Sequence, residues 1–180
     1  MSWLAGPYLV AAALLVAAGG PKVFRPRPAA RALASLHLPA SLPLVRVLGA
    51  AEVAIGAAAA TTRGWPAPAL VALSYVAFSL VVGLALARGG VLSSCGCFGT
   101  ADTPPTRTHL AVTLTLALAA GAVAFRPVGV LGDVLAGAPM AGLPFLALAA
   151  VCVWLAYLAL AVLPRSGGRA VAQAAGVRRT

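Results

Sequence analysis

Long stretches without charge constrain the fold of this sequence more than any other feature. Of its 180 residues, 9% are charged and 62% are hydrophobic. A helix that crosses a bilayer needs about 20 mostly apolar residues. Apart from Glu52, five windows are free of charge, at 3–20, 47–62, 64–87, 108–125 and 134–164, the last with its expected core at 142–163. We therefore predict an all-α fold, an integral membrane helical bundle of about five transmembrane helices.

The edges of these windows predict where the helices begin and end. Pro21 with Lys22 is expected to end the first helix. The second and fourth windows are short, so we expect their helices to extend past Arg46 and Arg107, whose long side chains reach the interface. Because no basic residue precedes the first window, we expect it to be a retained helix and not a cleaved signal peptide.

The length of the chain predicts a single domain. We assign residues 1–165 to the transmembrane bundle and 166–180 to a basic tail without regular structure. Between the first two windows, residues 29–38 combine basic and apolar side chains. This segment is expected to form a short amphipathic helix in the membrane interface.

Membrane topology explains the net charge of +10. The thirteen lysines and arginines lie in short connections and in the tail, and no basic groove interleaved with aromatic residues is present, which argues against nucleic acid as a partner. Cytoplasmic connections of membrane proteins are enriched in these residues. With the N-terminus outside, eleven of them face the cytoplasm and only Arg63 and Arg126 face outward. We predict a multi-pass protein of a bacterial inner membrane, in contact with the lipid bilayer, with its C-terminus in the cytoplasm.

Two cysteines separated by one glycine, Cys95 and Cys97, lie in the connection between the third and fourth windows. Gly96 and Gly99 supply the backbone freedom that a close approach of two thiols requires. A disulfide across so few atoms is constrained, and strained, accessible disulfides are the ones that tend to be catalytic or regulatory. We interpret the pair as a redox site. The alternative is two unpaired cysteines that behave as small hydrophobic residues.

Glu52 is the acidic residue within a predicted span. Ionisable groups at membrane depth usually face the bundle interior or a cavity. Glu52 is therefore either a proton acceptor or polar contact for the redox site, or a structural partner of a basic side chain such as Arg46 or His109. Its helical neighbours Gly49 and Gly56 predict a face on which another helix packs closely.

His109 begins the fourth window, twelve positions after Cys97. An imidazole there can stabilise a thiolate or accept its proton, or it can simply hydrogen-bond to a carbonyl at the interface. Cys152 lies near the middle of the fifth window. It is either a packing residue or a resolving thiol for the loop pair.

Taken together, these residues resemble the methylamine-utilisation MauE family, which is related to DoxX-like membrane proteins. The motif at 95–99, followed by His109 at the head of a helix, carries most of the resemblance. Two weaker stretches agree with it, the basic connection 22–39 and the segment 46–56, where a glutamate is followed by a glycine. The resemblance covers about residues 10–125.

The family is implicated in the maturation of a secreted quinone-containing dehydrogenase, through disulfide chemistry alongside a thioredoxin-like partner. The resemblance implies redox roles for Cys95 and Cys97, with Glu52 and His109 as supporting polar positions. Many members follow the histidine with an Arg-Asn pair.

The sequence departs from the family at that Arg-Asn pair, because it has Val112 and Thr113 there. We expect a polar contact in this helix to be lost and the partner or substrate to differ.

We predict a membrane thiol–disulfide redox protein, a candidate oxidoreductase, that exchanges electrons with a thioredoxin-fold protein. A quinone is a candidate cofactor, although no quinone-binding motif is recognisable. Two alternatives stay open: handling of Cu(I) or another soft metal by the thiolates with His109 or Cys152, and a scaffold without catalysis. The charge bias places the cysteine loop at the cytoplasmic face, whereas a disulfide generator for secreted proteins needs it outside.

Overall fold

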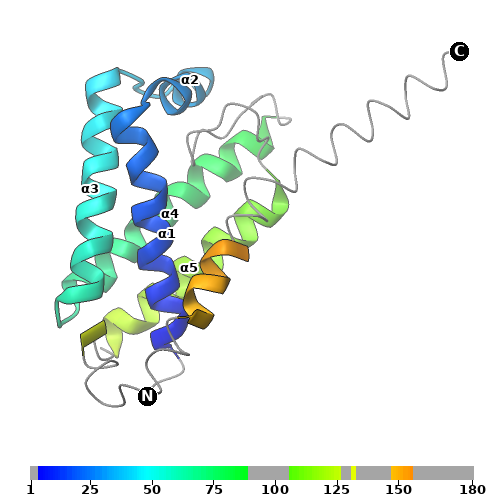
Figure 1. Ribbon diagram of the computed structural model, residues 1–180. Coiled ribbons are helices and arrows are strands. Elements are labelled where there is room, and N and C mark those ends of the chain that lie inside the picture. Colours follow the sequence, from blue (N-terminus) through cyan, green and yellow to red (C-terminus); the bar gives the residue numbers. More distant parts are fainter. Residues whose placement is uncertain (1–3, 89–105, 127–130, 133–146, 156–180) are drawn as a thin grey trace, which may run out of the picture.

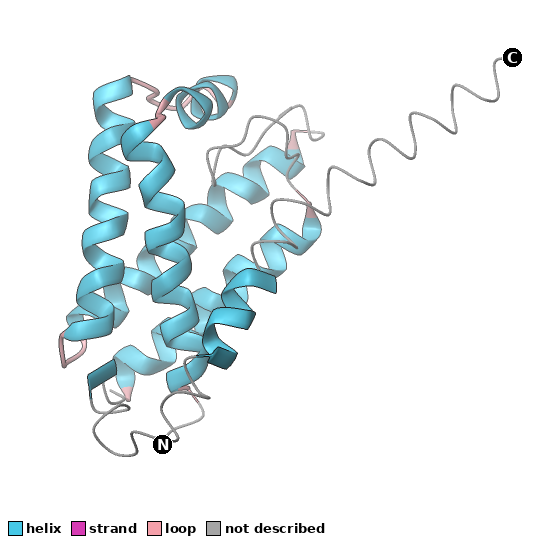
Figure 2. Cartoon of the chain, in the orientation of Figure 1, coloured by secondary structure: helices cyan, strands magenta, loops and turns pink. Residues whose placement is uncertain are grey.

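The computed structural model describes residues 4–88, 106–126, 131–132 and 147–155, and the regular structure in these residues is helical (Figure 2). A short helical segment covers 147–155. Five labelled helices precede it: α1 (Ala5–Phe24), α2 (Arg27–Ser35), α3 (Leu42–Thr61), α4 (Pro66–Ala87) and α5 (Arg107–Phe125). The prediction of an all-α fold is confirmed.

Four of the helices, α1, α3, α4 and α5, are long and apolar enough to cross a membrane. They run alternately up and down the bundle, with α1 beside α3 and α4 beside α5 (Figure 1). The prediction of a membrane helical bundle is confirmed, with four spans in the described part of the chain. The predicted fifth span includes the segment 147–155, whose Val153 packs against the bundle core; its other residues lie outside the described part.

The first helix runs past Pro21 to Phe24, so the prediction that it ends at Pro21 and Lys22 is wrong. A proline removes one hydrogen bond and crowds the preceding turn, but near a helix end other contacts can offset that cost. The helix ends instead before Pro26. The residue preceding a proline is pushed out of the helical region, and Arg25 accordingly has φ −133° and ψ 67°.

The structure confirms the predicted extension of the second-window helix past Arg46, whereas the fourth-window helix begins at Arg107 itself. The α3 helix extends past Arg46 and begins at Leu42, where the Ser41 side chain accepts a hydrogen bond from the Leu44 amide at 3.4 Å. The α5 helix includes Arg107 and is capped by Thr106. In both cases a hydroxyl at the N-cap position satisfies an amide that the helix itself leaves unpaired.

The short helix α2 lies across one end of the bundle (Figure 1). It forms within the connection where an amphipathic helix was predicted, about two residues earlier than expected. Its buried residues are alanines, whereas Arg27 and Arg31 are exposed. Arg88, just after α4, fixes its end by donating from Nη1 to the Leu36 carbonyl oxygen at 2.8 Å.

Glycines bring α1 and α3 into backbone contact. A Cβ built on Gly19 would lie 2.5 Å from the Gly49 carbonyl oxygen, and one built on Gly56 would lie 2.7 Å from the Ala12 carbonyl oxygen. Small residues allow this approach between membrane helices. The predicted packing face around Gly49 and Gly56 is confirmed, and it positions the polar site described below.

Candidate functional site

Lys22 of α1 and Glu52 of α3 form an ion pair inside the bundle. The Lys22 Nζ lies 2.6 Å from each carboxylate oxygen of Glu52. The two side chains are 6% and 3% exposed, respectively. Ionisable groups inside a membrane protein are costly, face the interior and commonly mark functional positions. This pair is the centre of the candidate site.

The glycine contact explains why the two charged side chains meet. Lys22 lies three residues after Gly19, and Glu52 lies three residues after Gly49. Residues three apart share one face of a helix, so each charge lies on the face that its glycine presents to the other helix. Because α1 and α3 touch through these glycines, the two side chains are enclosed between their own helices.

The α4 helix closes the site with two aromatic rings. The Lys22 Nζ lies 4.7 Å from the centre of the Phe78 ring, a position in which the ring face attracts a cation. The Tyr75 ring meets Phe78 edge-on, with the ring centres 5.6 Å apart and the planes at 89°. The Tyr75 hydroxyl in turn donates to the Ala11 carbonyl oxygen at 2.8 Å. Three helices therefore surround the ion pair.

The structure shows the structural pairing of Glu52 with a basic side chain that was one of the two alternatives, but neither Arg46 nor His109 supplies that side chain. Arg46 is exposed on α3, and the Glu52 carboxylate is paired with Lys22 rather than with Arg46 or His109. Lys22 was missed because it was assigned to the connection after the first helix. A usable signal exists in the sequence, because a charged residue follows a glycine by three positions in both places: Lys22 follows Gly19, and Glu52 follows Gly49.

His109 is buried at the start of α5, with 4% exposure. Its Nδ1 lies 2.8 Å from the Thr106 Oγ1, and its backbone amide donates to the same oxygen at 3.3 Å. The cap and the imidazole are thus held together in the first turn. The sequence correctly indicated a histidine at the head of this helix, and the structure adds Thr106 as the residue that orients it.

A polar contact joins α4 to α5 one turn further into the bundle. The Ser79 hydroxyl lies 2.9 Å from the Thr113 Oγ1, while the Thr113 hydroxyl donates to the His109 carbonyl oxygen at 3.0 Å. Thr113 thus makes polar contacts at one of the two positions where the sequence departs from the family pattern. The expected loss of the contact made by the Arg-Asn pair stays a prediction.

Of the three predicted cysteines, the structure describes only Cys152. It is exposed on the segment 147–155 and has no disulfide partner in the described part of the chain. Cys95 and Cys97 lie outside the described residues, in the connection between Arg88, which follows α4, and Thr106, which caps α5. Within the described residues, no three His, Cys, Asp or Glu side chains gather closely enough to hold a metal ion.

The fold and the enclosed ion pair define a multi-pass membrane protein with a polar site between its helices. Residues 2–126 match the family model described as methylamine utilisation protein MauE. Because this match covers more than half of the chain, the protein belongs to the MauE family. No curated protein and no solved structure gave a significant match.

Proposed function

We propose that this protein is a membrane thiol–disulfide redox protein that uses Cys95 and Cys97 to exchange electrons with a thioredoxin-fold partner. Its role would be to support disulfide formation in, or maturation of, another protein. One observation carries the proposal: a Cys-Gly-Cys sequence lies within the residues that match the MauE family, in the connection that leads directly to the buried His109.

The proposed exchange balances in electrons and protons. When the loop is reduced, the thiolate of one loop cysteine attacks a disulfide sulfur of the partner and displaces the other partner sulfur as a thiolate. The second loop cysteine, as a thiolate, then attacks its neighbour in the mixed disulfide. The loop becomes a disulfide and the partner a dithiol, because two electrons pass to the partner and its two thiolates take up the two protons that the loop thiols gave up. The same steps run in reverse when the reduction potentials favour oxidation of the partner. A quinone or a second thiol pair would return the loop to its starting state.

The structure supports roles for His109 and Glu52 near this chemistry. Amides at a helix N-terminus and a nearby imidazolium both favour a thiolate over a thiol. His109 and the cap residue Thr106 stand at the end of the connection that carries the cysteines. Glu52, paired with Lys22, would hold α1 and α3 together beside α4, the helix that leads into this connection. Cys152 remains a candidate resolving thiol.

Trapping of a mixed disulfide tests this function. In cells that express Cys95→Ser, with Cys97 retained, a mixed disulfide with a thioredoxin-fold protein should accumulate and be visible on non-reducing gels, because the resolving thiol is missing. The double variant Cys95→Ser with Cys97→Ser is the matched control and should trap nothing, because no loop thiol is left to attack the partner. If neither loop single variant traps a partner and the purified protein carries stoichiometric copper that the variants lose, the site binds metal. A fully functional double variant would leave only a scaffold.

A further inference from the structure

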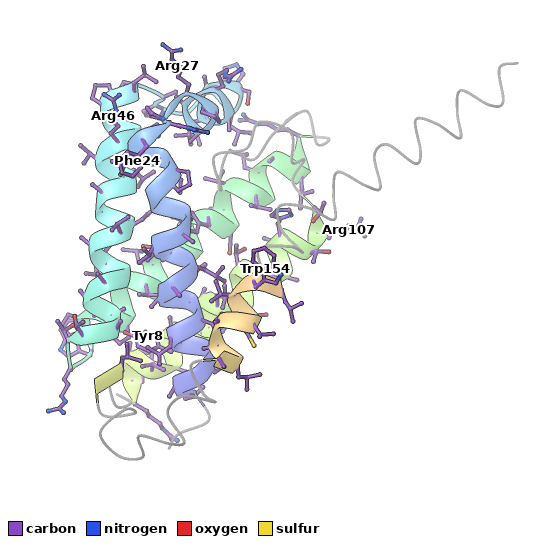
Figure 3. All side chains as sticks on the ribbon, in the orientation of Figure 1. Tyr8, Phe24, Arg27, Arg46, Arg107 and Trp154 are labelled. Atoms are coloured by element: carbon purple, nitrogen blue, oxygen red, sulfur yellow. The ribbon has the colours of Figure 1, made fainter. Side chains whose placement is uncertain are left out.

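Four arginines surround the joins between α1, α2 and α3 at one end of the bundle. Arg25 follows α1, Arg27 and Arg31 are one turn apart on α2, and Arg46 lies in the second turn of α3. All four are exposed. Figure 3 shows Arg27 and Arg46 at this end of the molecule. We call these four residues the arginine surface.

Packing of α2 keeps the arginine surface together. Ala29 and Ala30 of α2 pack against Val45 of α3, the residue just before Arg46. Arg27 and Arg31, four residues apart, share the face of α2 that is turned away from its buried alanines. The guanidinium groups of α2 and α3 therefore extend from helices that pack against each other and not from a connection without regular structure.

Acidic side chains are too few to neutralise the arginine surface. The whole chain contains three acidic residues. Glu52 is buried against Lys22, and the other two, Asp102 and Asp133, lie outside the described part. In the described part of the chain, Glu52 is thus the sole acidic side chain, and it is not available to the four guanidinium groups. The described arginine surface therefore carries a strong excess of positive charge.

Exposed apolar side chains lie directly beside the arginines. Phe24, which precedes Arg25, is 83% exposed, and Val47, which follows Arg46, is 66% exposed. Phe24 lies near Arg27 and Arg46 in the view of Figure 3. Apolar groups next to long cationic side chains are typical of the boundary between hydrocarbon and lipid headgroups. The charge and the apolar groups together therefore fit a molecule that has an anionic head and apolar chains.

We propose that the arginine surface binds the headgroup of an anionic phospholipid whose acyl chains lie against the exposed apolar side chains beside Phe24 and Val47. Guanidinium groups form paired, charge-assisted hydrogen bonds with phosphate oxygens. Basic residues close to a membrane surface each contribute attraction to anionic lipid. This site is independent of the cysteine loop and of the function proposed for it.

A comparison of two spin-labelled lipids, each added separately to the full-length protein, tests the site. The protein is reconstituted in phosphatidylcholine vesicles with a trace of spin-labelled phosphatidylglycerol or spin-labelled phosphatidylcholine, and the motionally restricted fraction is measured. We expect the phosphatidylglycerol probe to associate about fivefold more strongly or better, since one basic residue at a membrane surface is worth roughly that factor. The combined variant Arg25→Gln, Arg27→Gln, Arg31→Gln and Arg46→Gln should bring the two probes to within about twofold, because it removes those attractions.

Matched variants separate this site from general attraction. Arg63→Gln with Arg126→Gln, at the opposite end of the bundle, should keep the selectivity for phosphatidylglycerol. High salt should weaken the selectivity of the unaltered protein, because exposed charges are screened, and this measurement needs no variant that must fold. Inorganic phosphate at constant ionic strength should not compete; if it does, the ligand is free phosphate and the proposal is wrong. Equal association of both probes with the unaltered protein would also overturn it, and would leave topology or an acidic protein as the use of these charges.

Discussion

Lys22 and Glu52 bring two ionisable groups into the interior of the bundle, where each depends on the other. Removing one partner of a buried pair leaves an uncompensated charge and typically costs about 3–5 kcal/mol, whereas replacing both can be nearly neutral. We therefore expect Lys22→Met and Glu52→Gln each to lower the stability of the protein in detergent by about 3 kcal/mol. The double variant should recover most of the loss. Thermal unfolding of the unaltered protein, the two single variants and the double variant measures this coupling. If the double variant loses the sum of the two single losses, the two side chains do not stabilise each other.

The two partners also differ in how readily the sequence reveals them. Glu52 stands out because a carboxylate interrupts an otherwise uncharged window, and its interior position was predicted. Lys22 follows Pro21 in a run of basic residues, where a proline normally indicates the end of a helix. Its contacts with Glu52 of α3 and with the Phe78 ring of α4 make it an interior residue. Side-chain partners from distant helices depend on packing, which local patterns do not encode.

At the scale of the elements, glycines set the distance between α1 and α3. A Cβ on Gly49 would lie 2.7 Å from the Lys22 Cβ and 2.8 Å from the Gly19 carbonyl oxygen. Because backbone must move to admit a methyl group, we expect Gly49→Ala to destabilise the protein by about 1–3 kcal/mol. Gly83→Ala is the matched control, since no atom lies within 4 Å of its Cβ. It should be neutral or slightly stabilising, because alanine favours a helix. Equal unfolding temperatures for the two variants would show that the contact is absent.

The four described spans and their helical structure were predictable from the uncharged windows, whereas helix ends were predictable only where a local cap decides them. Ser41 and Thr106 supply such caps for α3 and α5. The end of α1 depends on Pro26 and on the buried Lys22 together, and the second of these is a tertiary effect. The aromatic residues Tyr75 and Phe78 were likewise missed, because apolar rings in an apolar window carry no distinguishing signal.

At the scale of the whole molecule, the alternating helices divide the connections between two ends of the bundle (Figure 1). The end of α1, all of α2, the start of α3, the end of α4 and the start of α5 share one end. The described arginines at this end are Arg25, Arg27, Arg31, Arg46, Arg88 and Arg107, whereas Arg63 and Arg126 belong to the other end. Lys22 is buried and is therefore not counted among the basic residues of either end. The excess of basic residues at the first end remains without it. The basic end is therefore expected in the cytoplasm.

The same division predicts on which side of the membrane the cysteine loop is reached. The connection that contains Cys95 and Cys97 joins α4 to α5 and therefore starts and ends at the basic end. In a background without the native cysteines, single cysteines are introduced by Arg27→Cys and by Arg63→Cys as markers of the two ends. A membrane-impermeant maleimide added to intact cells should label the Arg63→Cys marker only. The native pair, tested in its own background, should react like the Arg27→Cys marker, and only after the membrane is opened. Labelling of the native pair in intact cells would mean that the loop is reached from outside, so that its partner would be a secreted or periplasmic protein and the electrons would not come directly from a cytoplasmic donor.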